Sequence, residues 1–157
     1  MVYKIEKGNH RAGWFFRFTR KNKISGTIKF LGDVSYYINL QKDSNKIVGL
    51  SDGIHHHKHS ARIGWRFDAS RREIEIMTIT YKKGIRFINH LCYCKDNEEY
   101  AYEIIINKGY YVYRFDTNIS IVPRLSRWNC FRYTLGVYFG GKEPAPKSIY
   151  IKLEINE

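Results

Sequence analysis

The sequence predicts an all-β fold, an antiparallel two-sheet β-sandwich of the jelly-roll type with little helix. Three observations lead to this prediction. Many short segments rich in Ile, Val, Tyr, Phe and Thr alternate apolar and polar residues with period two. Residues that favour turns separate these segments at intervals of about 8–12 residues. No window carries the i, i+3, i+4, i+7 apolar stripe of an amphipathic helix.

Twelve segments fit the strand pattern. In chain order they are Val2–Lys7, Trp14–Thr19, Ile24–Phe30, Val34–Leu40, Lys46–Leu50, Arg62–Phe67, Glu73–Thr80, Ile85–Cys94, Tyr100–Asn107, Tyr110–Phe115, Cys130–Tyr138 and Ser148–Ile155. The turn signals along the same path are Gly8-Asn9, Ser25-Gly26, Gly32-Asp33, Asp52-Gly53, Lys83-Gly84, Lys108-Gly109 and Gly140-Gly141. With this many strands, closure into two packed sheets is the expected architecture.

Local signals refine this plan at three places. The strands on either side of Lys108-Gly109 form the clearest predicted hairpin. Two short stretches, Asp43–Lys46 and Pro123–Asn129, are each compatible with a single helical turn. Neither is long enough to change the fold class.

The composition predicts one domain spanning residues 1–157 with a substantial core. A chain of 157 residues buries roughly 68–70% of the surface that its unfolded form exposes. Aromatic residues make up 16% of the sequence, which is ample core material and excludes a disordered chain. We find no linker, internal repeat or low-complexity segment.

The charge is strongly positive and unevenly distributed. The formal net charge is +12, and residues 1–72 hold 15 Lys and Arg against 5 Asp and Glu, whereas residues 73–157 hold 12 against 10. Such asymmetry indicates a basic face and an anionic partner, such as a nucleotide, a nucleic acid, a phosphorylated small molecule or an acidic glycan. A basic surface that serves only solubility is the alternative.

Cellular context is predicted from absent signals. The N-terminus has no apolar signal segment, and no apolar run reaches the ~20 residues that span a bilayer. Cys92, Cys94 and Cys130 are odd in number and lack the spacing of a disulfide framework. We therefore expect a cytoplasmic protein with reduced thiols, no membrane partner and no cofactor.

The segment from His55 to Arg66 holds the densest group of chemically active side chains. It contains four of the six histidines and the cations Lys58, Arg62 and Arg66. If it were extended throughout, His55, His57 and His59 would share one face and His56, Lys58, Ser60, Arg62 and Arg66 the other. The two faces predict different chemistry.

The histidine face suggests a metal site, and the arginine face suggests an anion site. Imidazoles at spacing two can converge on zinc, but no Glu follows nearby, so His55, His57 and His59 form only a weak candidate set. Guanidinium forks match phosphate or carboxylate, and the Ser60 hydroxyl, the imidazoles and the Trp65 ring would add hydrogen bonds and stacking. An exposed basic loop with Trp65 in the core is the structural alternative.

The segment from Leu135 to Pro146 is the second unusual stretch. Its glycines, Gly140 and Gly141, permit close backbone approach, and its prolines fix the exit of the loop. We expect it to be a structural turn, or alternatively one wall of a pocket opposite residues 55–66 in which Tyr138, Gly140 and Gly141 contact the ligand.

Three stretches carry a resemblance to a known group of proteins. They are residues 3–10, the H-x-x-S-A-R-x-G-W-R stretch of residues 57–66 and the Y-F-G-G-x-x-x-A-P stretch of residues 138–146. With these, the chain resembles a poorly characterised family of small bacterial β-sandwich proteins. The resemblance covers nearly the whole chain and implies a small, standalone, intracellular β domain, without implying any chemistry.

The functional prediction is a non-catalytic protein that binds an anionic ligand through Ser60, Arg62 and Arg66. Three alternatives stay open: a carbohydrate-binding module, a His-dependent phosphodiesterase and a structural protein that assembles with copies of itself. No nucleophile elbow, paired carboxylates or other catalytic signature orders the histidines, so an enzyme is the less favoured class.

Overall fold

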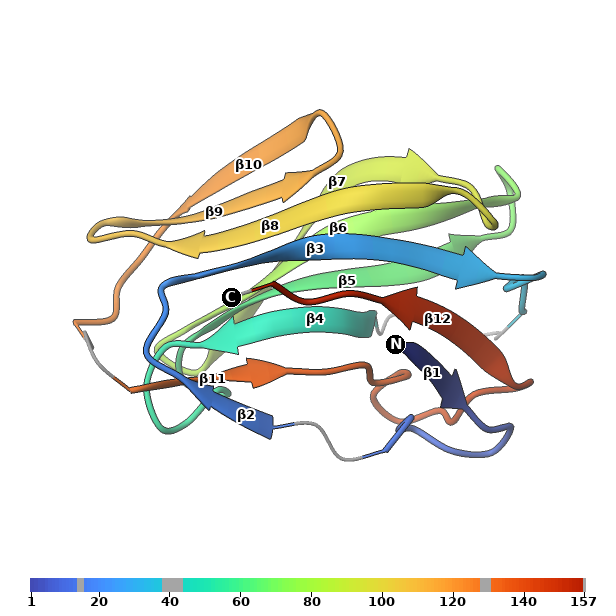
Figure 1. Ribbon diagram of the computed structural model, residues 1–157, viewed down its shortest axis with the longest axis horizontal. Helices are drawn as coiled ribbons and strands as arrows, with labels where there is room; N and C mark the ends of the chain where they lie inside the picture. Colours follow the sequence, from blue (N-terminus) through green and yellow to red (C-terminus); the bar gives the residue numbers. More distant parts are fainter. Residues whose placement is uncertain (14–15, 38–43, 128–130, 157) are drawn as a thin grey trace.

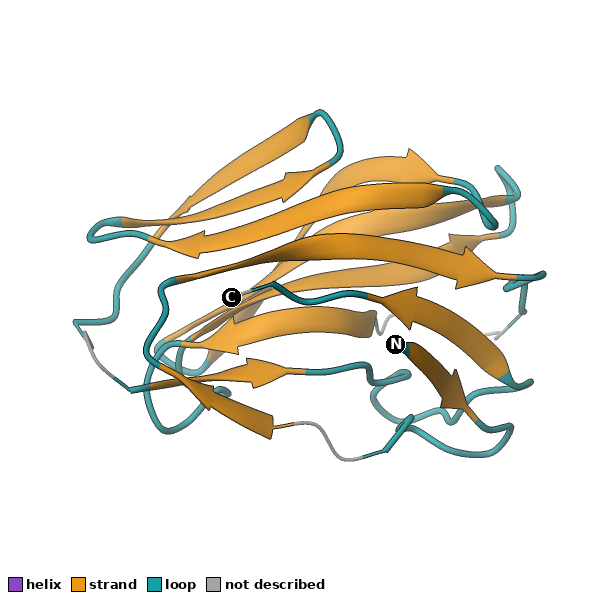
Figure 2. Cartoon of the chain, in the orientation of Figure 1, coloured by secondary structure: helices purple, strands orange, loops and turns teal. Residues whose placement is uncertain are grey.

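Strands and loops make up the described part of the chain, without a helix (Figure 2). The structure, a computed structural model, describes residues 1–13, 16–37, 44–127 and 131–156. The strands are β1 (Val2–Ile5), β2 (Phe16–Thr19), β3 (Lys23–Leu31), β4 (Asn45–Ser51), β5 (Ser60–Asp68), β6 (Glu73–Lys82), β7 (Ile85–Cys94), β8 (Glu99–Ile106), β9 (Tyr110–Phe115), β10 (Asn118–Pro123), β11 (Arg132–Leu135) and β12 (Ile149–Leu153). The all-β prediction is confirmed.

These strands form two six-stranded sheets that lie one over the other (Figure 1). The order β1-β12-β3-β8-β9-β10 defines what we call the β3 sheet, and β2-β11-β4-β5-β6-β7 defines the β5 sheet. Neighbouring strands pair antiparallel throughout, as in the central pairs of β3 with β8 and of β5 with β6. The two-sheet jelly-roll sandwich is therefore the observed architecture.

The core lies between the sheets, and β5 shows how the sequence divides its two faces. Ala61, Ile63 and Trp65 point into the core and are at most 1% exposed. The Trp65 ring meets Phe30 of the opposite sheet at 5.0 Å between centroids, with Phe139 at 6.1 Å. Because side chains alternate along a strand, the even-numbered residues of β5 lie on the open face of the β5 sheet.

Residues Val34–Tyr37, the described part of the expected strand Val34–Leu40, do not form a strand, so that prediction is wrong there. Residues 38–40 lie outside the described ranges. Val34 and Tyr36 are nonetheless buried, which explains the alternating pattern. The Tyr36 hydroxyl accepts hydrogen bonds from the Asn45 side chain and the Phe67 amide, so side-chain contacts anchor this segment.

Strand β10 is absent from the prediction because its turn carries no glycine. Asn118 pairs directly with Phe115, which leaves a two-residue loop, and Asp116 adopts φ +51° there. Aspartate tolerates this left-handed conformation better than most residues, although the usual signal is Asn-Gly or Asp-Gly. The expected helical turns are also wrong where described: residues 45–46 belong to β4, and residues 124–127 form no helix.

Both described cysteines lie on β7 and are free thiols. Cys92 and Cys94 pair with Ile76 and Ile74, so they share the core side of the sheet as the spacing predicts. Burial raises the pKa of the Cys92 thiol to about 11 and that of Cys94 further. Cys130 lies outside the described residues.

Candidate functional site

The open face of the β5 sheet presents a row of side chains that the strand register defines. Directly paired residues share a face. From β2 across to β7 the pairs join Phe16, Leu135, Gly49, Arg62, Ile79 and Ile88, which we call the Arg62 row. A second set of pairs on the same face joins Ser60 to Tyr81 and Tyr81 to Arg86.

A pocket of about 340 Å³ opens on this face over the Arg62 row. We call it the Arg62 pocket. Its described lining residues are Arg11, Gly13, Phe16, Lys46, His56, His57, Arg62, Tyr81, Arg86, Leu135, Gly136, Val137, Tyr138, Gly140 and Gly141. Four of these described lining residues are cations and none of them is a carboxylate, so the described lining is positively charged.

Arg62 is the unusual group of the pocket, because it is a buried cation for which no described carboxylate serves as an ion-pair partner. The residue is only 7% exposed. Its Nε donates to the Ser60 hydroxyl at 3.3 Å, and its guanidinium lies 5.3 Å from the centroid of the Tyr81 ring. Its Nη2 atom is buried and has no hydrogen-bond partner. Burial lowers the pKa of this guanidinium, which shows that the site disfavours the bare charge.

The glycine in the neighbouring strand makes room for this arginine. A Cβ atom at Gly49 would stand 2.6 Å from Cγ of Arg62 and 2.8 Å from the carbonyl oxygen of Ala61. Any larger residue at this position would therefore displace the Arg62 stem. The pocket floor depends on this close approach of β4 and β5.

Residues 55–59 form a turn, which we call the His turn, and not the extended strand that the alternating faces assumed. The amides of Lys58 and His59 both donate to the carbonyl of His55, at 2.8 and 3.2 Å. As a result, His56 and His57 lie side by side with ring centroids 4.3 Å apart, and both line the pocket. The expectation that these two histidines face opposite sides is wrong.

The two pocket histidines are held in an environment that keeps them neutral. Atom Nδ1 of His56 lies 2.7 Å from the Tyr133 hydroxyl, and the His57 ring meets Tyr81 at 5.4 Å. Burial, reinforced by the charge of Arg62, lowers the pKa of His56 to about 4. The same two causes lower the pKa of His57, with Lys46 adding to the effect. Both rings are thus uncharged near neutral pH and able to accept a proton.

This pKa shift makes stability depend on pH. Because the pKa of His56 is about 4 in the folded protein against an ordinary value of 6.5, the unfolded chain binds more protons between these values. The contribution of His56 to the free energy of unfolding is therefore fully present above about pH 6.5, and it is lost as the pH falls toward 4. Urea unfolding across this range should show a smaller pH slope for His56→Gln than for wild type. His55→Gln, at an exposed position of the same turn, is the control, and an unchanged slope in His56→Gln contradicts the assignment.

Part of the Leu135–Pro146 segment, residues 135–138, 140 and 141, lines the same pocket as His56 and His57. The Lys46 ammonium donates to the Gly140 carbonyl at 2.9 Å, and the Gly140 amide donates to Oδ1 of Asn45 at 2.6 Å. Gly140 adopts φ +64°, a left-handed conformation that glycine permits. The Tyr138 ring contacts two cations: its centroid lies 5.4 Å from the Lys46 ammonium and 5.9 Å from the Arg11 guanidinium.

Several sequence-predicted site residues lie elsewhere. Trp65 is fully buried in the core and offers no face for stacking, so that part of the prediction is wrong. Lys58 and His59 do not line the pocket, although they belong to the His turn. Nδ1 of His59 is buried without a hydrogen-bond partner, and burial lowers the pKa of this ring. Ser60 is buried and does not line the pocket. Its hydroxyl donates a hydrogen bond to the His56 carbonyl and accepts one from Arg62, so it supports two residues that do.

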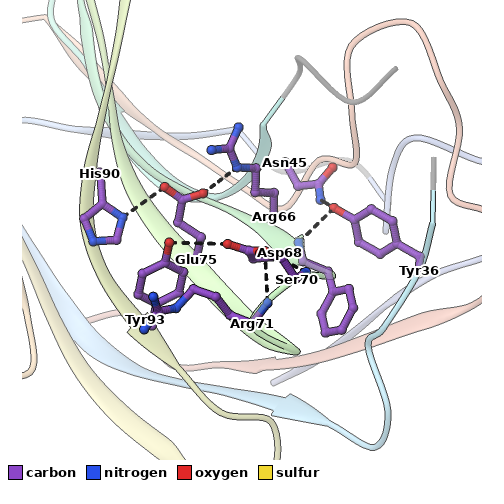
Figure 3. A network of polar contacts seen from close by, with 10 residues as sticks. Tyr36, Asn45, Arg66, Asp68, Ser70, Arg71, Glu75, His90 and Tyr93 are labelled. Carbon is purple, nitrogen blue, oxygen red and sulfur yellow. Dashed lines mark hydrogen bonds and ion pairs between the residues drawn. The ribbon is translucent and has the colours of Figure 1, made fainter. Parts of the chain in front are cut away.

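Arg66 belongs to a separate polar cluster further along β5 (Figure 3). Its Nε donates to Glu75 at 2.5 Å, and Nδ1 of His90 contacts the other oxygen of Glu75 at 2.9 Å. The Glu75 side chain is 8% exposed, so the Arg66 guanidinium neutralises a mostly buried carboxylate that also contacts His90. Arg66 is therefore paired already, in contrast to Arg62.

Outside the Leu135–Pro146 segment, six described lining residues were not predicted from the sequence: Arg11, Gly13, Phe16, Lys46, Tyr81 and Arg86. A signal for two of them exists. A hairpin centred on Lys83-Gly84 pairs Tyr81 with Arg86 across the turn, and the pair occupies the same face as Ser60. Arg11 and Lys46 carry no comparable signal, because both reach the pocket through isolated bridges to Tyr138.

The described residues offer neither a metal cluster nor a membrane-spanning helix. Within residues 1–13, 16–37, 44–127 and 131–156, no group of three His, Cys, Asp or Glu side chains is placed to hold a metal ion. The weak metal alternative at His55, His57 and His59 is therefore not among the arrangements that the described residues form. The same residues include no helix of the length and apolarity that a membrane span requires.

Comparison with solved structures finds the same two-sheet fold in proteins of low sequence identity. No protein-family model and no curated protein matches the sequence. The alginate lyase AlyC3 is similar with a TM-score of 0.67 and 14% identity, over 99% of this chain and 74% of that one. Alginate lyase A1-II′, a member of polysaccharide lyase family 7, is similar with a TM-score of 0.54 and 10% identity, over 97% of this chain and 64% of that one. SCLam, a non-specific endo-β-1,3(4)-glucanase from family GH16, is similar with a TM-score of 0.50 and 11% identity, over 90% of this chain and 61% of that one.

Proposed function

We propose that this protein binds an acidic polysaccharide, one built from uronate sugars, across the open face of the β5 sheet. The observation that carries the proposal is Arg62, a buried guanidinium whose Nη2 has no hydrogen-bond partner, in a pocket whose described lining is cationic. A sugar carboxylate accepting from Nη2 would satisfy that atom and neutralise the charge. Lys46, Arg86 and Arg11 surround the same space.

The composition of the face favours a sugar over a nucleotide. The described lining combines cations with Tyr81, Tyr138 and Phe16, whose rings suit the apolar faces of pyranose units. The row of paired residues crosses all six strands, so the face suits an extended ligand. Among the similar structures are two alginate lyases and an endo-β-1,3(4)-glucanase, which supports the carbohydrate-binding alternative predicted from the sequence.

Hydrolysis of the glycosidic bond is not supported. Glycosidases of the common type place two carboxylates on either side of the scissile bond, about 5–9.5 Å apart. The described lining of the Arg62 pocket holds none. Glu75, on the same face, is engaged by Arg66 and His90.

Cleavage by β-elimination is the second candidate, and the neutral His57 ring beside Arg62 favours it. In this reaction the proton on C5 of a uronate passes to a base and the C4–O bond breaks. A double bond forms between C4 and C5, and the leaving oxygen takes up a proton. Arg62 would neutralise the carboxylate, His57 would accept the proton, and a lining tyrosine such as Tyr138 would supply one.

Calorimetry with four probes tests the proposal: an oligouronate, a neutral gluco-oligosaccharide of equal length, ADP and a short RNA. We expect binding of the oligouronate alone, weakened as salt is added because the contacts are ionic. Binding of ADP or RNA without oligouronate binding overturns the proposal. A rise in ultraviolet absorbance from the C4–C5 double bond, reduced about 100-fold or more in His57→Ala, would add the lyase activity. No rise leaves the protein as a binding module.

A further inference from the structure

Four aromatic side chains extend the open face beyond the Arg62 pocket, at the edge formed by β2 and β11. We call Phe16, Phe18, Phe131 and Tyr133 the aromatic strip. The three phenylalanines are exposed, and Phe18 is the most exposed at 72%. Their rings touch: Phe18 meets Phe131 at 5.5 Å and Tyr133 at 6.2 Å, and Phe16 meets Tyr133 at 5.1 Å.

The strip is continuous with the pocket. Phe16 lines the pocket itself and lies 6.0 Å from the ring of His56. The Tyr133 hydroxyl contacts Nδ1 of the same histidine at 2.7 Å. The register places Phe18 opposite Tyr133 and Phe16 opposite Leu135, which is a member of the Arg62 row. One surface therefore runs from the cations of the pocket to the exposed ring of Phe18.

We propose that the aromatic strip is a stacking subsite for a sugar ring of the same acidic polysaccharide, several units away from the carboxylate held by Arg62. This inference rests on the proposed function. Strand β2 lies three strands from β5, which is about 14 Å at the usual strand spacing. A disaccharide seated on Arg62 is too short to reach Phe18, whereas a hexasaccharide laid across the strands covers both.

The chemistry of the strip favours a sugar over a lipid surface or a second copy of the chain. Its exposed apolar side chains are all aromatic, whereas those of β10 at the edge of the other sheet, Ile119 and Ile121, are aliphatic. Aromatic faces suit the C–H faces of a pyranose and allow its hydroxyls to stay in water. The adjoining cations of the pocket would hold the acidic groups of the same chain, so a single ligand satisfies both halves of the surface.

Binding of oligouronates of two lengths to Phe18→Ala tests the inference. We expect the dissociation constant of a hexasaccharide to rise about 3- to 10-fold, as loss of one aromatic contact implies, and that of a disaccharide to stay unchanged. Phe18→Trp should keep wild-type affinity. Tyr110→Ala is the matched control, because Tyr110 is a 53% exposed aromatic of the other sheet.

The outcomes separate this inference from the proposed function. Unchanged hexasaccharide affinity in Phe18→Ala, with binding still strongly weakened in Arg62→Met, overturns the stacking subsite alone. Equal losses for both ligand lengths also overturn it, because Phe18 would then act by shaping the pocket. Loss of self-association in light scattering, or of binding to anionic phospholipid vesicles, without a change for the hexasaccharide assigns the strip to another occupant. If neither variant alters binding, the proposed function fails as well.

Discussion

Arg62→Met is expected to weaken the binding of acidic oligosaccharides strongly while leaving the protein at least as stable as wild type. Removing one partner of a buried charged contact costs about 2–5 kcal/mol of binding free energy, which is about 30-fold or more in the dissociation constant. In the free protein, however, the guanidinium is 7% exposed and its Nη2 is unsatisfied. Replacing it with an apolar side chain should raise the free energy of unfolding by about 1 kcal/mol.

This opposite movement of affinity and stability distinguishes a ligand-binding arginine from a structural one. Replacing a structural arginine would lower affinity and stability together. Calorimetry with an oligouronate and urea unfolding of the same samples provide the two measurements. Arg114→Met is the control, because Arg114 is half exposed on β9 and is paired with Glu103 at 3.4 Å, so neither quantity should move much. A marked loss of stability in Arg62→Met contradicts a ligand-binding role for this arginine.

Arg62→Lys separates charge from geometry at the same position. Lysine keeps the positive charge but loses the planar fork that holds a carboxylate by two hydrogen bonds. Its affinity should fall between those of the wild type and Arg62→Met. This intermediate value would show that the pocket reads the shape of the anion as well as its charge.

The face on which Arg62 lies could be predicted from the sequence, because strand alternation is a local property. Ala61, Ile63 and Trp65 alternate with Ser60, Arg62 and Gly64, and only one assignment buries the tryptophan. The same rule failed at His55–His59. There the chain turns, and the alternation of side chains that the rule assumes does not exist.

The rest of the pocket depends on contacts that no local pattern encodes. Tyr138 bridges both Arg11 and Lys46, which are far from it in the chain. Such pairings are set by how the two sheets close, since burial of the whole core decides them together. The charge of residues 1–72 predicted a cationic face. That the described pocket lining contains no carboxylate is seen only in the folded structure.

Beneath the His turn lies a buried charged network, and it should dominate the stability of the protein. Asp52 follows β4 and receives two hydrogen bonds from Arg124, at 2.7 and 2.8 Å, and one from the Tyr111 hydroxyl at 2.7 Å. The Asp52 side chain is completely buried and that of Arg124 is 3% exposed. Because Tyr111 lies on β9, this carboxylate joins the two sheets.

The same residue also closes the His turn. The Asp52 amide donates to the His59 carbonyl at 2.9 Å, which fixes the base of the loop that carries His56 and His57. The Arg132 guanidinium lies 3.8 Å from the same carboxylate. Loss of the negative charge would therefore remove a counter-charge that both buried arginines share.

Asp52→Asn is expected to lower the free energy of unfolding by about 3–5 kcal/mol, because breaking a buried ion pair leaves an uncompensated charge in the interior. Asparagine preserves the size and shape of the side chain, so the loss reports the charge and not a cavity. Asp33→Asn is the matched control: this carboxylate is 70% exposed and pairs with Lys147 at 2.9 Å, so its loss should cost about 0–1 kcal/mol. Urea unfolding at pH 7 measures both. Equal, small losses in the two variants would show that the Asp52 network does not hold the sheets together at the His turn.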